Sequence, residues 1–183
     1  MYRLLLIILA GSVLGCYTPS TDKNYTYYKS RLSLASIEQG YDTLAINIWY
    51  LPPFGNSKAM VSITADSSGY TASYSSFSTL LNDRWQPAHF QLLTHRKLTP
   101  KHGWKYFDSL LEINHIRTLP DMDKIPGFNH IISDGILYVV EIATPRSYRQ
   151  YNYTSPKNFQ NEFPHIKRMV GILEAIKEEL GAP

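Results

Sequence analysis

Short stretches in which apolar and polar residues alternate, each bounded by turn residues, constrain the fold of this chain most strongly. Residues 44–51 are the clearest example, because Leu44, Ile46 and Ile48 fall on one face and two prolines follow. Side chains of a strand point to opposite faces in turn, so this alternation predicts a strand with one apolar face. By the same reasoning, further strands are expected at residues 59–65, 70–75, 89–97, 136–143 and 148–153.

Helical spacing of apolar residues marks two other segments. Thr99 and Pro100 make a typical helix start, with threonine as the N-cap and proline in the first turn, and this helix is expected to run to about Asn114. After Pro156 the apolar residues again recur at helical spacing, up to Gly181, a residue type common at helix C-termini. A short helical turn is also expected at residues 77–83, and a loop at 118–130.

Together these elements predict an α+β fold: an antiparallel β-sheet with a middle helix and a C-terminal amphipathic helix packed on one side. Hydrophobic residues make up 44% of the chain and charged residues 18%, which suits a folded domain with a real core. The 14 tyrosines, against 7 phenylalanines, favour β structure and surfaces that contact a partner. A single domain, residues 41–183, is expected to hold the whole fold.

The N-terminal segment carries the features of an export signal. Arg3 supplies a positive charge, and residues 4–10 form an apolar run that is too short to span a bilayer, which needs about 20 residues. Cys16 follows several small residues and is the only cysteine of the chain, so no internal disulfide can form. The pattern therefore predicts a secretory signal that ends near Cys16.

The four residues that end at this cysteine read Val13-Leu14-Gly15-Cys16 and resemble the lipobox of bacterial lipoproteins. The resemblance implies cleavage before Cys16, lipidation of that cysteine by a diacylglycerol thioether and an N-acyl chain such as palmitate, and anchoring in the cell envelope. Residues 1–15 are then a signal peptide, and residues 16–40 are the lipidated cysteine and a flexible tether. Tyr17, in place of aspartate, favours the outer membrane by the sorting rule of enteric bacteria. The alternative is a secreted protein whose cysteine lies near the cleavage site by chance.

A second resemblance covers roughly residues 98–180. The pattern Asp-Gly-x-x-Tyr-x-x-Glu at residues 134–141, followed by Tyr-Arg-x-Tyr-x-Tyr at 148–153, resembles the closing hairpin of uncharacterised bacterial lipoproteins. This resemblance implies the same fold and the same location, and it brings no activity with it.

The turn between these two strands leaves two registers open. A three-residue connection places Glu141 opposite Arg149 as a cross-strand ion pair, whereas a four-residue connection places Arg149 opposite Ile142. The charge pairing favours the first register. The hairpin residues then either tie the strands together and cover the core, or form a patch that faces a ligand, since tyrosine and arginine are common at binding hot spots. The candidate binding residues are Tyr138, Glu141, Arg149, Tyr151 and Tyr153.

Known catalytic and cofactor motifs do not occur in the sequence. The six histidines show no zinc-ligand spacing, and there is no nucleophile elbow, P-loop or dinucleotide-binding glycine pattern. Asp121, Asp123 and Asp134 lack the further oxygen ligands of a calcium loop, so a solvated turn is expected there. We therefore expect no catalytic residue, no metal and no cofactor. Basic residues are scattered and the net charge is only +3, so no nucleic-acid partner is expected either.

The sequence thus predicts a membrane-anchored envelope lipoprotein that is not an enzyme and that binds an envelope protein or polymer. Two alternatives stay open. One is an immunity lipoprotein that neutralises a toxin. The other is a hydrolase of an envelope polymer, in which scattered residues such as His130 and Asp134 would have to converge near Tyr138.

Overall fold

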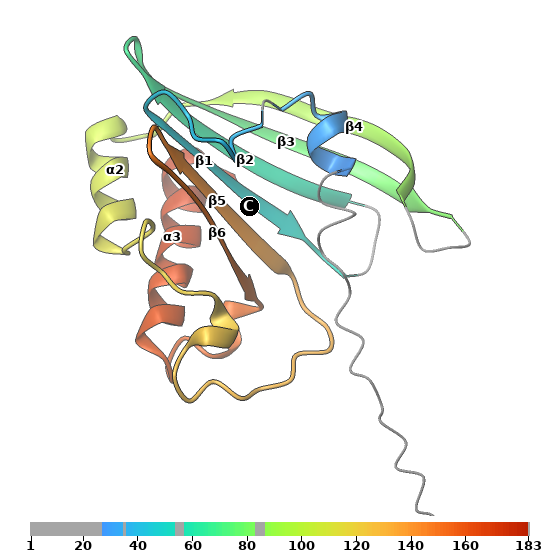
Figure 1. Ribbon diagram of the computed structural model, residues 1–183, viewed down its shortest axis with the longest axis vertical. Helices are drawn as coiled ribbons and strands as arrows, with labels where there is room; N and C mark the ends of the chain where they lie inside the picture. The colour runs from blue at the N-terminus through green and yellow to red at the C-terminus, as the bar shows by residue number, and fades with distance from the viewer. Residues whose placement is uncertain (1–26, 35, 54–56, 83–86, 183) are drawn as a thin grey trace, which may run out of the picture.

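The computed structural model describes residues 27–34, 36–53, 57–82 and 87–182. Its centre is a six-stranded antiparallel sheet in the order β4-β3-β2-β1-β5-β6 (Figure 1). The strands are β1 (Leu44–Leu51), β2 (Ser57–Asp66), β3 (Gly69–Leu81), β4 (Pro87–Leu98), β5 (Leu137–Thr144) and β6 (Ser147–Thr154).

Helices flank the sheet. They are a short helix at residues 27–31, α2 (Trp104–Ile113) and α3 (Pro164–Leu180), and two 3-10 turns, η1 (Met122–Lys124) and η2 (Pro156–Asn158), lie in the connections. None of the helices in the described part of the chain is long and apolar enough to cross a membrane.

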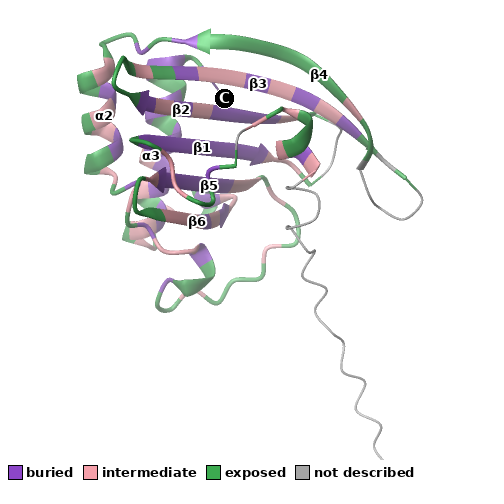
Figure 2. Cartoon of the chain, turned by 45° about the horizontal axis from the view of Figure 1, so that its top comes forward, coloured by how far each residue is buried: buried purple, intermediate pink, exposed green. Residues whose placement is uncertain are grey.

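Helices α2 and α3 cover one face of the sheet, which confirms the predicted α+β fold with its middle and C-terminal helices on one side (Figures 1 and 2). Ile46 and Ile48 of the central strand β1 belong to the core between the sheet and these helices, together with Ile166 and Ile176 of α3. Successive residues of β1 point to opposite faces, so only alternate side chains reach this layer. Gly181, with φ of 61°, ends α3 in the left-handed conformation that glycine adopts without strain, as predicted.

The opposite face of the sheet is covered by residues 27–34 and 36–41, which we call the strap. Tyr28 of the strap is buried and packs against Phe77 of β3, with 5.3 Å between the ring centroids. Ile37 is also buried, on the neighbouring part of the same face. Both faces of the sheet therefore carry a hydrophobic layer, and β1, in the middle, is buried on both sides.

The strap changes the expected domain boundary. The tether was predicted to extend from Cys16 to residue 40, but from Tyr27 onward the chain packs on the sheet as part of the domain. The reason is that the strap carries apolar side chains and the second face of the sheet presents apolar residues such as Trp49 and Met60 for burial. Residues 16–26 of the predicted tether, with Cys16, lie outside the described residues.

The helical turn predicted at residues 77–83 is wrong, because β3 continues as a strand to Leu81. Ser75, Phe77 and Thr79 are all buried on the strap side, which is the period-two pattern of a strand. Pairing with β2 and β4 on both sides supplies hydrogen bonds that local helical preference could not outweigh.

The start of α2 also differs from the prediction. The helix begins at Trp104 with Gly103 at the cap position, four residues after the N-cap expected at Thr99. The intervening segment is held instead by the end of α3: the Lys101 amide donates to the Glu179 carbonyl at 3.0 Å, and the His102 amide donates to the Glu179 carboxylate at 3.0 Å. Hydrogen bonds to the end of α3 therefore hold this segment outside the helix, and Thr99 does not become the N-cap.

Candidate functional site

The register of the β5–β6 hairpin decides where the candidate binding residues point. Arg149 pairs with Ile142 and Glu141 pairs with Gln150, so the register favoured by charge pairing is wrong and the alternative is observed. Only Pro145 and Arg146 separate the last pair of the ladder, Thr144 and Ser147. A shift of one residue turns every side chain of a strand to the other face, so Glu141 and Arg149 lie on opposite faces of the sheet.

Arg149, Tyr151 and Tyr153 lie on the helix side. Tyr151 and Tyr153 are fully buried, and the Tyr151 hydroxyl donates to the Ile116 carbonyl at 2.8 Å. The Arg149 guanidinium donates to the carbonyl of Arg117 and, at 2.5 Å, to that of Leu119. Burial raises the pKa of both tyrosines, so both stay neutral. These side chains attach the segment after α2 to the sheet.

Tyr138 lies on the same face, half-buried, with its ring edge on Tyr50 at 5.3 Å between centroids. Of the five candidate residues, Glu141 is the one whose side chain lies on the strap side. The five candidate residues therefore do not share one surface, and three of them, Glu141, Tyr151 and Tyr153, are fully buried.

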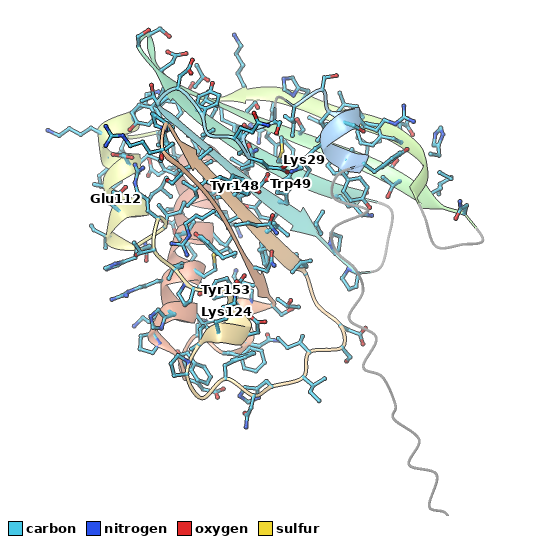
Figure 3. The ribbon with its side chains drawn as sticks, in the orientation of Figure 1. Lys29, Trp49, Glu112, Lys124, Tyr148 and Tyr153 are labelled. Atoms are coloured by element: carbon cyan, nitrogen blue, oxygen red, sulfur yellow. The ribbon has the colours of Figure 1, made fainter. Side chains whose placement is uncertain are left out.

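Glu141 is fully buried, and four side chains of the described part of the chain donate hydrogen bonds to it. The donors from the sheet are the Trp49 indole at 3.0 Å, the Tyr148 hydroxyl at 2.8 Å and the Asn47 amide at 3.4 Å. The fourth donor is the Lys29 ammonium of the strap, at 3.2 Å. Figure 3 shows Lys29, Trp49 and Tyr148 from three separate elements gathered on this face. We call these five residues the Glu141 network.

Lys29 joins the network to a second carboxylate, because its ammonium also lies 2.5 Å from Glu38 of the strap. Burial lowers the pKa of Lys29, but its contacts with Glu38 and Glu141 together outweigh burial and raise it above the ordinary value. Burial and the hydrogen bond to Glu141 likewise raise the pKa of Tyr148. Lys29 is therefore charged and Tyr148 neutral at physiological pH, and the network fastens the strap to the sheet.

The hairpin motif of the sequence indicates Glu141 but none of the side chains that bind it. Asn47 and Trp49 lie on the second face of β1, which the alternation treated as the polar side. A usable signal was the asparagine inside an otherwise apolar strand, since a buried amide needs a hydrogen-bonding partner. Lys29 could not be found this way, because it is 112 residues from Glu141 in sequence.

A hollow of about 680 Å³, which we call the groove, opens at the end of the sheet where β1 ends and β5 begins. Its lining residues come from the end of β1, from η1 and the loop after it, and from the end of β6. The apolar part of the lining includes Leu51, Met122, Phe128, Ile132 and Leu137. The polar part includes Asp121, Asp123, His130, Ser133 and Asn152.

One wall of the groove is fixed to the free edge of β6. The backbone amide of Asn152 donates a hydrogen bond to one carboxylate oxygen of Asp121 at 3.0 Å. The other oxygen of this carboxylate lies 2.5 Å from the Lys124 ammonium. The Thr154 amide donates to the sulfur of Met122 at 3.3 Å. Two outward-pointing amides of the edge strand are thereby occupied, which holds η1 in place and protects this edge from pairing with another strand.

The other wall is aromatic. Phe128 contacts Phe159 and Phe163, with centroid distances of 5.4 and 5.5 Å, and His130 lies 4.7 Å from the Phe159 ring. His130 is also 3.5 Å from the Glu162 carboxylate. Packing on both sides makes the groove a preformed cavity rather than an opening between loose loops.

The groove also brings together residues that the sequence left scattered. Asp121, Asp123 and His130 line it, whereas Asp134 is exposed and is not part of the lining. Within the described ranges, no three histidine, aspartate, glutamate or cysteine side chains are close enough to hold a metal ion.

Comparisons with protein-family models, with curated proteins and with solved structures find no match to this chain. Function is therefore inferred from the residues and their geometry.

Proposed function

We propose that the chain is a lipoprotein of the bacterial cell envelope, anchored through lipid on Cys16 in the outer membrane, whose domain binds a partner protein in the groove. The lipobox-like residues before Cys16 support the anchor. The binding role is a non-enzymatic one, which needs no cofactor and no nucleic acid.

The groove is the observation that carries this proposal. Its volume of about 680 Å³ lies within the range of known ligand sites, roughly 300–1,000 Å³. Apolar and polar side chains line it in about equal number, and two carboxylates lie at η1, of which Asp121 is already paired with Lys124. This chemistry fits an extended protein segment that presents an apolar side chain next to a basic residue.

A hydrolase of an envelope polymer is a second candidate, because His130 and two carboxylates line the same groove. Release of soluble fragments from isolated envelope polymer by the wild-type chain, but not by His130→Ala, would favour this candidate over a binding module.

We expect Cys16→Ala to abolish the incorporation of a labelled fatty acid, because Cys16 is the only thiol that lipid can modify. The measurement is metabolic labelling followed by gel fluorescence of the purified chain. Ser20→Ala, four residues away and outside the lipobox, is the matched control and should keep its label. A label that persists in Cys16→Ala would contradict lipid anchoring at this residue.

We expect Ser133→Trp to reduce capture of the partner by about tenfold, equivalent to about 1.4 kcal/mol of binding free energy. Ser133 is exposed in the lining, so an indole there fills the groove without disturbing the core. The measurement is in-cell crosslinking with quantitative mass spectrometry of the captured proteins.

The matched control for this experiment is Ser109→Trp, which places the same side chain at an exposed position of α2 outside the groove. Equal capture by wild type and Ser133→Trp, with both chains folded by circular dichroism, would exclude the groove as the binding site.

A further inference from the structure

The β3–β4 hairpin carries exposed apolar side chains on both of its faces, from the middle of β4 to the end of β3. Leu80 of β3 is 51% exposed, and Leu92 and Leu93 of β4 are each 48% exposed. Leu92 pairs with Phe77 on the strap side, whereas Leu80 pairs with His89 on the helix side. We call Leu80, Leu92 and Leu93, with the half-buried Phe90, the hairpin tip.

The two helices leave the hairpin tip uncovered. Among the described residues, the core under α2 and α3 includes from β4 only Leu98, at the far end of that strand. Figure 2 shows β4 exposed along most of its length, at the edge of the sheet. An apolar group in such a place is typical of a surface that contacts a partner or a membrane.

The strap begins at the same end of the hairpin. The Tyr28 ring lies 5.3 Å from Phe77, and Phe77 stacks on Phe90 at 5.2 Å. Only eleven residue steps separate Cys16 from Tyr27, a reach of at most about 36–40 Å when fully extended and about 17–20 Å for a flexible chain. A lipid on Cys16 therefore keeps the bilayer within a short distance of the hairpin tip.

The charged residues near the hairpin tip favour an anionic bilayer as the surface that the tip contacts. Neither β3 nor β4 contains an acidic residue, and Lys58 of β2, which pairs with Phe77, places its ammonium 5.7 Å from the centroid of the Tyr28 ring. Arg31 lies over the Tyr27 ring at the start of the strap, at 5.2 Å from its centroid. Basic residues beside exposed leucines are the combination that binds the headgroup region of anionic membranes.

We infer that the hairpin tip is a membrane-contacting surface that places its exposed leucines in the interface of an anionic bilayer. This inference rests on the proposed lipid anchor. Leu51, which lines the groove, pairs with Leu137 at the end of the sheet toward which β3 also runs, so the groove and the hairpin tip lie at the same end of the sheet.

The test uses the lipidated full-length chain, in which Cys16 carries the lipid and a second cysteine can be labelled selectively. Leu92→Cys and Leu93→Cys are coupled to an environment-sensitive fluorophore and reconstituted into vesicles of phosphatidylglycerol and phosphatidylcholine. We expect a blue shift and higher emission at both positions. Ile113→Cys on α2 is the matched control, because Ile113 is a 69% exposed apolar residue of the helix layer, and its label should keep the emission seen in water.

Four other outcomes would contradict the inference as a whole or one of its steps. A purified chain whose mass shows no lipid contradicts the anchor, and with it the inference. A lipidated chain that floats with the vesicles, but whose labels at Leu92 and Ile113 emit alike, contradicts the membrane contact alone. An equal blue shift in vesicles of phosphatidylcholine only would contradict the role of charge. A shift that grows with protein concentration in detergent, without vesicles, would assign the surface to a second copy of the chain.

Discussion

Replacing Glu141 with alanine is expected to lower the free energy of unfolding by about 3–5 kcal/mol, the range for breaking a buried ion pair by removing one partner. Glu141 is fully buried and is the shared acceptor of the Lys29 ammonium, the Trp49 indole and the Tyr148 hydroxyl. Without the carboxylate, these donors lose their shared acceptor inside the sheet–strap interface. Urea denaturation followed by circular dichroism measures the loss.

The matched control is Glu112→Ala, which removes a carboxylate that is 47% exposed and paired with Arg117 on the surface. Its expected effect is below about 1 kcal/mol, as for most exposed ion pairs. Limited proteolysis adds a local readout, because the Glu141 variant should be cleaved faster within the strap than the control. Similar stability losses for Glu141→Ala and Glu112→Ala would show that the network does not hold the strap.

Tyr151→Ala is expected to lower the free energy of unfolding by about 3–5 kcal/mol, because it removes a fully buried aromatic ring and leaves a cavity. Tyr151→Phe keeps the ring and loses only the hydrogen bond to the Ile116 carbonyl, so a loss of about 1 kcal/mol is expected. Thermal and urea unfolding of the three chains give the comparison.

Tyr153 supplies the control for the hydroxyl. It is as buried as Tyr151 on the same strand, but its hydroxyl has no hydrogen-bonding partner among the described residues. Tyr153→Phe is therefore expected to leave stability unchanged or slightly raised. A larger loss for Tyr153→Phe than for Tyr151→Phe would contradict the assignment of Tyr151 as the hydrogen-bonded member of the pair.

The candidate site was only partly predictable. The hairpin motif drew attention to Glu141, but the partner expected for it was Arg149, and the structure pairs it with Lys29 instead. Charge complementarity between neighbouring strands is worth less than about 1 kcal/mol per pair, so it does not determine a register by itself. Tyr151 and Tyr153 are large aromatic side chains, and their burial under the helices stabilises the observed register by more than the ion pair would stabilise the other one. Because Arg149 alternates with them on the same strand face, this register places it on the helix side.

The groove could not be predicted from the sequence either, because it too depends on contacts between residues that are far apart in the chain. The segment around Asp121 and Asp123 was expected to be a solvated turn, but it lies on the free edge of β6, where Asp121 accepts the amide of Asn152. No local pattern encodes that contact, because the two residues are 31 positions apart and meet only after the sheet has formed.

The sequence by itself determined the local elements and the layering. Alternation in β1 and helical spacing in α3 are set by side-chain geometry within a few residues, so they could be recognised without knowledge of the fold. Only the tertiary structure decided the β5–β6 register, the extension of β3 and the inclusion of the strap in the domain. Each of these depends on which distant surfaces are buried together, and burial is a property of the whole packed chain.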